Sequence, residues 1–207
     1  MATAGTTPEA AANTGKGTEL STFKTYLAGG GARANQFRIH MNWPVGISGT
    51  TAAHITGDAT TALKYLCSAT SLPGMTLGEV TVPFRGRNLY MAGDRTFEAW
   101  TITVLNDTDF KIRNAYETWI NYINAMTDNS GTDAPAAYTA TAHVYQLNRA
   151  GGRIKTYSFQ GLWPTTISNI DVSAETNDAI ETFDVTLRYN YWEATATDGE
   201  TVASTTS

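Results

Sequence analysis

The three histidines are the side chains of this chain best suited to holding a metal ion. His40, His54 and His143 share no helix-face spacing, and the chain contains neither an HExxH nor a CxxC pattern. A metal site needs several ligands that converge on one point. We therefore expect no metal and no cofactor, and we interpret the histidines as solvated or hydrogen-bonded side chains.

Two glycine-rich stretches have the composition of phosphate-binding loops without the spacing. Residues 15–18 read Gly-Lys-Gly-Thr. A phosphate loop needs Ser or Thr directly after the lysine, and a glycine five residues before the glycine that precedes it. Those two positions hold Gly17 and Ala10. A dinucleotide-binding loop must follow a strand, and no strand pattern precedes the three glycines at residues 29–31. Neither stretch is therefore expected to bind a nucleotide.

Acid–base or nucleophilic chemistry has little support in the sequence. Asp171, Glu181 and Asp184 could form a carboxylate pair, but acidic residues on strands near solvent are usually plain surface charges. A Ser-His-Asp triad remains an open alternative without a GxSxG elbow to support it. Cys67 follows Tyr65 and Leu66, which indicates a buried small hydrophobe rather than a reactive thiol. No catalytic residue is predicted, and we do not expect an enzyme.

Composition limits the classes of protein that remain. Of 207 residues, 42% are hydrophobic and only 16% are charged, which is low against the usual quarter. A surface poor in charge fits a subunit that packs against copies of itself, and it also fits a solitary Thr- and Ala-rich sheet protein. The single cysteine precludes an intrachain disulfide. No apolar run reaches membrane-helix length, and the first residues lack a signal-peptide pattern, so we expect a reducing cytoplasm.

The charge is spread without a basic stripe. The formal net charge is −5, of which residues 1–19 carry −1 (Glu9, Glu19, Lys16) and residues 194–207 carry −2 (Asp198, Glu200), leaving about −2 for residues 20–193. Sequence-independent DNA binding depends on neutralising phosphates with Lys and Arg. If DNA meets this protein, weak or repulsive contact is expected.

Period-two alternation dominates the pattern and predicts about eight strands. The predicted strands cover residues 35–42, 75–83, 96–105, 138–147, 154–161, 165–172 and 182–192, with a short one after residues 85–89. A turn is predicted at 92–95 and a Gly-Gly hairpin at 148–153, and the pattern of residues 60–70 does not decide between helix and strand. The last strand alternates most clearly: one face carries Phe183, Val185, Leu187, Tyr189 and Tyr191, and the other carries Thr182, Asp184, Thr186, Arg188, Asn190 and Trp192.

One amphipathic helix is predicted after residue 108, capped by Asp107 or Thr108. Its apolar stripe consists of Ile112, Ala115, Tyr116, Trp119, Ile123 and Met126. Residues 43–61, with Pro44 and three glycines, are predicted to be a long loop. The fold class is therefore mainly β, with two packed antiparallel sheets in a sandwich or squashed barrel and one helix at an edge or end. Residues 1–19 are expected to be a flexible arm, 20–193 the domain, and 194–207 a polar tail.

Four segments together resemble the tail tube proteins of contractile-tailed bacteriophages. They are FKTYLAGGGARANQFRIHMNWP, LCSATSLPGMTLGEVTVPFRGRN, TFEAWTITVLNDTDFKIRNAYETWINYIN and YSFQGLWPTTISNIDVSAETNDAIETFDVTLRYNYWE. The resemblance covers roughly residues 20–193. It implies a structural virion protein that forms hexameric rings, which stack into a hollow tube inside a contractile sheath. The implied partners are further copies of the chain, the sheath, baseplate and tail terminator proteins, and double-stranded DNA that passes without specific binding; no membrane is implied. Assembly is expected in the cytoplasm of the bacterial host.

Within this resemblance, alternation and loop length give three sets of candidate residues. The lumen or inter-subunit sheet face is assigned to Thr182, Asp184, Thr186, Arg188, Asn190, Glu79 and Glu98. The ring-stacking loop is assigned to Trp43, Val45, Ile47, His54 and Asp58. The interface aromatics are Trp163 and Trp192, because tryptophan is favoured at interfaces. The alternatives are a related tube without DNA cargo, from a contractile bacteriocin or a type VI secretion-like apparatus, and a solitary enzyme or sugar-binding sandwich.

Overall fold

The structure, a computed structural model, describes residues 16–27, 30–47, 53–175 and 177–196. Most of the predicted N-terminal arm and residues 197–207 of the predicted tail lie outside these ranges. The elements follow in the order α1 (Lys16–Tyr26), β1 (Phe37–Asn42), η1 (Val45–Ile47), α2 (Ala53–Leu66), β2 (Cys67–Thr70), β3 (Thr76–Phe84), β4 (Arg87–Thr96), β5 (Trp100–Leu105), α3 (Lys111–Ile123), α4 (Pro135–Tyr138), β6 (Ala140–Leu147), β7 (Arg153–Ile167), β8 (Thr182–Arg188) and β9 (Tyr191–Ala196).

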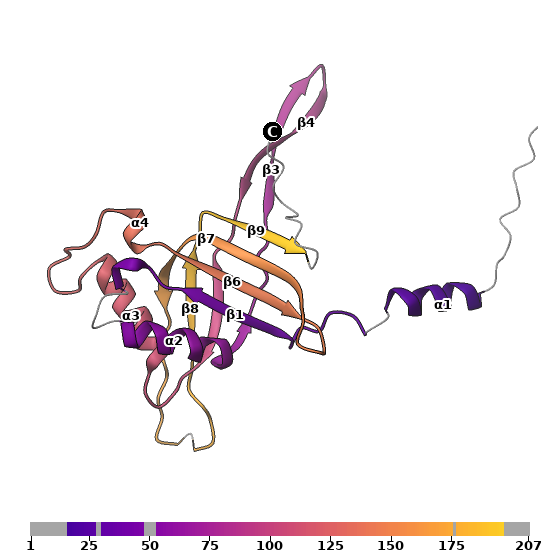
Figure 1. Ribbon diagram of the computed structural model, residues 1–207. Coiled ribbons are helices and arrows are strands. Elements are labelled where there is room, and N and C mark those ends of the chain that lie inside the picture. The colour runs from indigo at the N-terminus through magenta and orange to yellow at the C-terminus, as the bar shows by residue number, and fades with distance from the viewer. Residues whose placement is uncertain (1–15, 28–29, 48–52, 176, 197–207) are drawn as a thin grey trace, which may run out of the picture.

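The main sheet folds into two layers that share strand β7 (Figure 1). In layer A, the first part of β7 pairs with β6 and β9, and β6 pairs with β1, all antiparallel. In layer B, the last part of β7, from Trp163 to Ile167, pairs with β8, which pairs with β5 and then β2. Gly161, with φ +65°, stands where β7 passes between the layers. The predicted fold class, mainly β with two antiparallel sheets, is confirmed.

Alternation buries one face of each layer against the other. Ile39, Val144 and Phe159 are fully buried from layer A, and Ile102 and Val185 are fully buried from layer B. The remaining members of the core are Met41, Ile47, Leu63, Trp100, Val104, Ile112, Tyr116, Trp119, Ala140, Ala142, Leu162, Phe183 and Leu187. The opposite face of each layer carries mostly polar side chains, so the two layers present two polar sheet surfaces to solvent or to other molecules.

Helix α3 confirms the predicted amphipathic helix. Ile112, Ala115, Tyr116 and Trp119 are its buried residues. The N-cap position is Phe110, which makes no side-chain cap hydrogen bond, but the Lys111 N–H donates to Asp107 Oδ1 at 2.9 Å, so Asp107 satisfies one N–H of the first turn. The stripe was extended too far, because the helix ends at Ile123 and Met126 is 78% exposed. The described helices are too short or too polar to cross a membrane.

The predicted long loop at 43–61 is wrong. Its described residues form the 3-10 turn η1 and the first half of α2. The α2 sequence is rich in Thr and contains Gly57, so local propensity is poor. The helix holds because Ala59 and Leu63 are fully buried where α2 packs on β1 and α3. Tertiary packing therefore decided this segment rather than any local signal.

The region 76–96 forms a long hairpin that stands clear of the body (Figure 1). The predicted loop at 85–89 is confirmed only at its first two residues, because β4 begins at Arg87, and the predicted turn at 92–95 is wrong. The chain reverses at Arg85 and Gly86, which both have positive φ, and residues 92–95 continue β4. Strands β3 and β4 pair only with each other, as a separate two-stranded sheet.

Strand boundaries near the C-terminal end also differ from the prediction. The predicted strands 154–161 and 165–172 are largely one strand, β7. The predicted single strand at 182–192 is two strands, β8 in layer B and β9 in layer A. The chain bends at Asn190, whose N–H donates to the Gln160 carbonyl oxygen at 2.9 Å. Strand β9 reaches Ala196, three residues beyond the predicted end of the domain.

Candidate assembly surfaces

The described residues contain no group of three or more His, Cys, Asp or Glu side chains that could hold a metal ion. His40 and His143 lie opposite each other on β1 and β6, with ring centroids 6.4 Å apart. His143 Nδ1 lies 2.9 Å from Ser158 Oγ. Partial burial, followed by the nearby His40 and Arg153, lowers the pKa of His143, so this histidine is a hydrogen-bonded surface side chain. The side chain of His54 lies outside the described residues.

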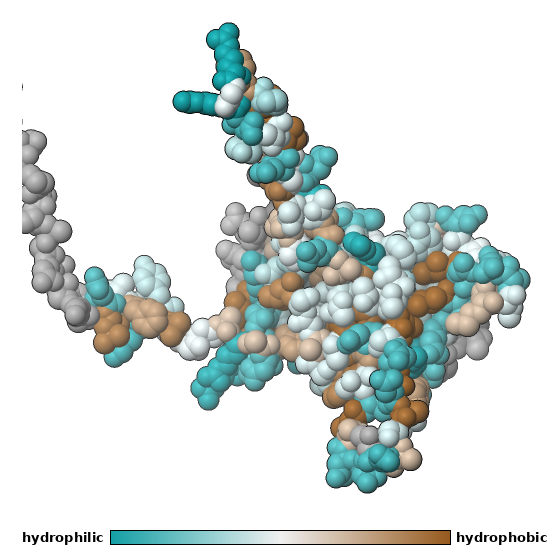
Figure 2. Space-filling view, turned by 180° about the vertical axis from the view of Figure 1, so that it is seen from behind, coloured by the Kyte–Doolittle hydropathy of each residue, from teal (hydrophilic) through white to brown (hydrophobic). Residues whose placement is uncertain are grey.

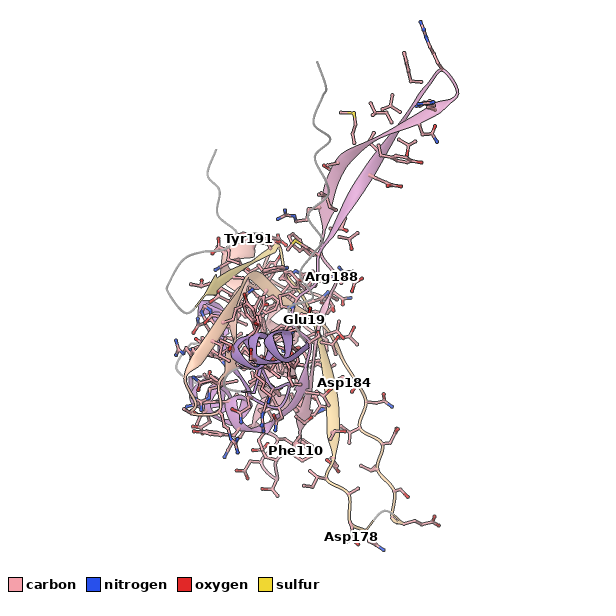
Figure 3. The ribbon with its side chains drawn as sticks, turned by 90° about the vertical axis from the view of Figure 1, so that its right-hand side faces the viewer. Glu19, Phe110, Asp178, Asp184, Arg188 and Tyr191 are labelled. Carbon is pink, nitrogen blue, oxygen red and sulfur yellow. The ribbon has the colours of Figure 1, made fainter. Side chains whose placement is uncertain are left out.

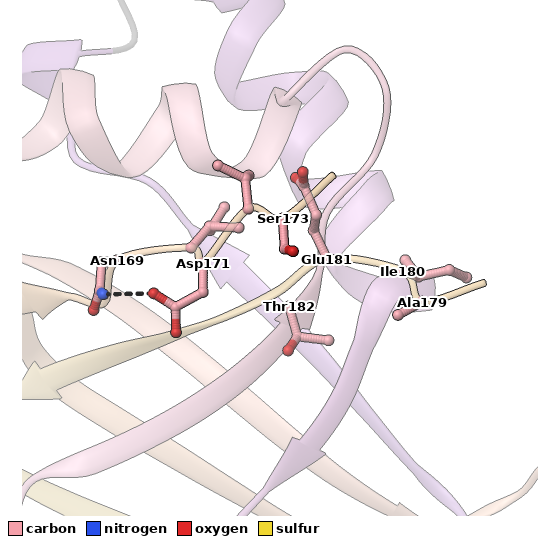
Figure 4. Close-up of a pocket in the computed structure, with 9 residues that line it drawn as sticks. Asn169, Asp171, Ser173, Ala179, Ile180, Glu181 and Thr182 are labelled. Atoms are coloured by element: carbon pink, nitrogen blue, oxygen red, sulfur yellow. Dashed lines mark hydrogen bonds between the residues drawn. The ribbon is translucent and has the colours of Figure 1, made fainter. Parts of the chain in front are cut away.

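The three candidate carboxylates are held apart by separate neutral partners. Asp171 accepts from Asn169 Nδ2 at 3.2 Å, and Glu181 accepts from Asn106 Nδ2 at 2.9 Å. Figure 4 shows the carboxyl groups of Asp171 and Glu181 pointing in different directions across an open pocket. Asp184, on β8, accepts from the Thr103 hydroxyl at 2.6 Å. No acid–base pair is formed by these three groups.

Cys67 is the free cysteine and begins strand β2. Burial raises the pKa of its thiol to about 12, and a backbone hydrogen bond at Ala69 offsets only part of this. The reactive form of cysteine is the thiolate. Cys67 is therefore an unreactive packing residue, in line with its sequence context.

Four of the predicted sheet-face residues gather on the polar face of layer B. Thr182, Asp184, Thr186 and Arg188 alternate along β8 with the buried Phe183, Val185 and Leu187. In Figure 3, Asp184 and Arg188 lie on the same side of the molecule. Hydroxyl side chains surround them on β5 and β7: Thr101, Thr103 and Thr165 all make hydrogen bonds to β8. The polar face of layer B is thus rich in threonine side chains and carries few charges.

The other three predicted face residues do not join this surface as a set. Asn190 sits at the bend after β8, where its backbone turns toward layer A. Glu98 is exposed in the short link between β4 and β5. Glu79 is on β3 in the projecting hairpin, away from β8. Sequence alternation located the face on β8 but not its extension to other strands.

The hairpin β3–β4 has one apolar face, which the sequence analysis missed. Cross-strand pairs place Val80 beside Met91 and Val82 beside Leu89, with Phe84 on the same face near the tip. All five side chains are at least 40% exposed, and Phe84 is 66% exposed. Figure 2 shows apolar side chains along this projection. The alternation of residues 80, 82 and 84 with 89 and 91 was the available signal.

A second projection, the β7–β8 loop, lies at the opposite end of the body from the hairpin (Figures 1 and 3). It carries Val172 and Ile180, which are 79% and 69% exposed. In Figure 3, Asp178 marks its tip. Apolar side chains therefore extend from both ends of the subunit.

Two residues of the predicted ring-stacking loop are used inside the subunit. The Trp43 ring packs edge-on against Tyr116 and Trp119, with centroids 5.0 and 5.6 Å apart, and Ile47 is 3% exposed in the core. Asp58 is exposed on α2. The side chains of Val45 and His54 lie outside the described residues. Ring stacking by this set stays a prediction, although Trp43 and Ile47 already have contacts within the subunit.

The two predicted interface tryptophans are both partly buried against the core. Trp163 pairs with Arg188 where β7 joins layer B. Trp192, on β9, packs edge-on against Tyr157 at 5.6 Å. Its indole nitrogen is buried without a hydrogen-bond partner among the described residues. A contact with another chain stays a prediction for both.

The fold, the projecting apolar hairpin and the threonine-rich sheet face belong to a structural subunit. The chain is a member of the phage tail tube protein family, whose model matches residues 32–195. It is 35% identical over 130 residues to tail tube protein gp19 of Enterobacteria phage T4, covering 62% of this chain and 80% of the relative. It is 31% identical over 170 residues to the tail tube protein of Serratia phage KSP90, covering 82% and 93%.

Solved structures with the same fold come from contractile injection systems. A chain of the anti-feeding prophage tube-terminating cap superposes with a TM-score of 0.57 at 14% identity, covering 80% of this chain and 91% of that one. A chain of the PVC sheath-tube complex, from an extracellular contractile injection system, gives a TM-score of 0.53 at 14% identity, covering 84% and 97%. At this identity the likeness concerns the fold alone. The family match and the two phage relatives, rather than these structures, show that the chain is a tail tube protein, as the resemblance in its sequence implied.

Proposed function

We propose that the chain is the ring-forming subunit of the inner tube of a contractile phage tail. Six copies close into a ring, the rings stack into a hollow tube, and the genome leaves the capsid through the lumen. Membership of the tail tube family supports the class. The observation that carries the assembly is the hairpin β3–β4, which cannot be explained within a single subunit.

A two-stranded hairpin alone is marginally stable in water. The β3–β4 hairpin nevertheless exposes Val80, Val82, Phe84, Leu89 and Met91 on one face. Contiguous exposed apolar surface on a soluble protein marks an interaction site. In the proposed tube, this face packs on a copy in the adjacent ring. The β7–β8 loop at the opposite end gives the stack a second contact and a direction.

The polar face of layer B is the proposed lumen wall. Its threonines are hydrogen-bonded to one another and to Asp184, so they offer DNA few free donors. Phosphate binding depends on clustered Lys and Arg, and the described part of β8 contributes only Arg188, whose guanidinium lies 3.4 Å from the Phe97 carbonyl oxygen. A lumen wall that carries little charge, and whose polar groups are hydrogen-bonded to one another, lets double-stranded DNA slide without specific binding.

The remaining partners follow from the position of a tube inside a tail. The outer wall meets the sheath, and the two ends of the tube meet the baseplate and the tail terminator. Structures with the same fold come from assemblies that include a sheath, a baseplate and a terminating cap. Assembly takes place in the cytoplasm of the bacterial host, and the subunit has a structural rather than an enzymatic role.

A second candidate is the inner tube of a contractile bacteriocin or type VI secretion-like apparatus without DNA cargo. The fold likeness to the tube of an extracellular injection system favours considering it. Such a tube would use the same hairpin and ring contacts. Neighbouring genes separate the two: capsid and terminase genes are expected beside this one for a phage.

The test is assembly of the purified protein, followed by negative-stain electron microscopy and sedimentation velocity. Hollow rings or tubes are expected, either spontaneously or after addition of purified baseplate as a seed. A protein that stays monomeric at high concentration and also fails to extend from the seed would refute the proposal.

A further inference from the structure

Helix α1 exposes apolar side chains that its own subunit does not cover. Phe23 is 59% exposed and Tyr26 is 87% exposed, and Leu20 and Leu27 are about half exposed. The spacing of Leu20, Phe23 and Leu27 puts them on one side of the helix. In Figure 1, α1 stands clear of the sandwich beyond the start of β1, and in Figure 3 it lies in front of the body, near the labelled Glu19.

An isolated helix of this length is marginal in water. Its persistence as the 11-residue α1 therefore points to a partner that packs on the apolar side. The match to the family model begins at residue 32, after the end of α1.

A matching groove lies on the other side of the body, between η1 and the end of α3. Its volume is about 500 Å³. Ile47, Tyr122 and Ala125 supply apolar walls, and none of the lining residues is charged. Asn121, Ser130 and Thr132 are among its polar lining residues. Met126, next to Ala125 in the chain, is 78% exposed.

The groove is preformed. Asn121 Oδ1 accepts from the Met126 N–H at 3.1 Å, and the Ala125 N–H donates to the Ser130 carbonyl oxygen at 2.7 Å. A side chain at Gly46 would collide with the Tyr122 ring, so the glycine keeps η1 close against α3. A partner entering this groove does not have to order it first, which favours binding.

Figure 1 shows α1 and α3 at opposite sides of the body, and the groove lies beside α3, so we infer that α1 does not fill the groove of its own subunit. In a closed ring, head-to-tail contacts set one side of each subunit against the opposite side of the next. We propose that α1 of one subunit lies in the η1–α3 groove of its neighbour in the same ring, with Phe23 and Leu27 against Tyr122 and Ala125. This inference rests on the proposed ring and specifies a contact within it.

Disulfide trapping tests the contact directly. In a Cys67→Ala background, a Phe23→Cys protein is mixed with a Thr132→Cys protein, assembled, oxidised and separated on a non-reducing gel. A heterodimer is expected. Thr25→Cys, on the opposite side of α1, is the matched control and should give at least roughly fivefold less heterodimer, because distance and direction decide whether a disulfide forms.

The outcomes separate this contact from the ring itself. Rings without the heterodimer, or with equal yields from the Phe23 and Thr25 variants, overturn the α1 contact and leave the tube standing. A Phe23→Cys protein that instead links to Leu89→Cys assigns α1 to the hairpin and also overturns it. If neither rings nor heterodimers form with a baseplate seed, the contact and the proposed function both fail.

A second measurement does not depend on introduced cysteines. The double variant Phe23→Ala/Leu27→Ala should raise the concentration at which rings dissociate by roughly tenfold or more, as measured by sedimentation velocity. Thr22→Ala, on the polar side of α1, is the control and should leave that concentration unchanged. An unchanged midpoint in the double variant would contradict the inference.

Discussion

The indole of Trp100 lies nearly parallel to the ring of Phe159, with centroids 4.4 Å apart and planes inclined by 16°. Trp100 belongs to β5 in layer B, and Phe159 belongs to β7 where it runs in layer A. Both side chains are buried. Trp100 Nε1 donates to Thr70 Oγ1 at 2.8 Å, so the indole enters the core without an unpaired donor. This pair ties the two layers together.

Removing one partner of this pair should destabilise the subunit strongly. Phe159→Ala is expected to lower the free energy of unfolding by about 3–5 kcal/mol, because it deletes a buried aromatic side chain and leaves a cavity. Urea unfolding of the disassembled subunit, followed by tryptophan fluorescence, measures the loss. Tyr26→Ala, at a position that is 87% exposed, should change the same free energy by less than about 0.5 kcal/mol. Similar losses in the two variants would contradict the assigned core.

The apolar face of the hairpin should control stacking without controlling folding. Val82→Ser/Leu89→Ser is expected to leave the unfolding midpoint of the subunit nearly unchanged, because both side chains are already largely exposed in it. Tube growth in electron micrographs should be lost. The matched control is Thr81→Ser, on the opposite face of β3, which should assemble normally. Tubes of normal length from the double variant would mean that this face is not the stacking surface.

The proposed lumen wall predicts an effect of added positive charge on DNA passage. Thr186→Lys places an ammonium on the polar face of layer B, where it attracts phosphates, so phage carrying the variant should eject DNA more slowly. Thr156→Lys adds the same charge to the polar face of layer A and is the control. The rate of DNA ejection from virions, followed with a fluorescent dye, distinguishes the Thr186→Lys variant from the Thr156→Lys control. Equal rates in wild type and Thr186→Lys virions, in tubes that form normally, would remove layer B from the lumen.

His143 should make the stability of the subunit sensitive to mild acid. Burial, with His40 and Arg153 nearby, holds its pKa below the ordinary value of 6.5 in the folded state. As the pH falls below 6.5, the unfolded state takes up the proton first, so stability declines until the pH passes the lowered folded pKa. His143→Gln, which can still bond Ser158, should flatten this decline in thermal melts between roughly pH 7.5 and 5. An unchanged slope would assign the acid sensitivity to other groups.

Local signals in the sequence were sufficient where packing and propensity agree. The stripe of α3 was predictable because Ile112, Tyr116 and Trp119 recur at helical spacing and Asp107 can cap the first turn. The same holds for Phe183, Val185 and Leu187 on β8, which alternate with polar residues. The same alternation located part of the threonine-rich face, because the polar residues of β8 occupy the positions between its buried residues.

The wrong secondary-structure predictions concern segments whose conformation is determined by contacts with residues distant in the chain. Helix α2 has weak propensity and is held by α3 and β1. In the hairpin, Gly93 and Asp94 look like turn residues, yet they continue β4. The register with β3 shifts there, opposite Gly78, and there is little room for a side chain at either glycine. At Asn190 the alternation continues unbroken through a bend, so the change of layer leaves no trace in the pattern. The η1–α3 groove likewise joins segments that are more than 70 residues apart, beyond the reach of any local pattern.

Strand β7 runs through both layers as a single 15-residue strand. Each layer includes part of this strand, so the placement of one layer constrains the placement of the other. Strand β7 pairs with β6 across a short turn and with β8 and β9 further along the chain, so completing its pairing requires non-local contacts as well as local ones, and non-local contacts form slowly. The domain should unfold as one cooperative unit, and a defect anywhere along β7 should lower the midpoint of the whole transition rather than loosen one wall of the tube.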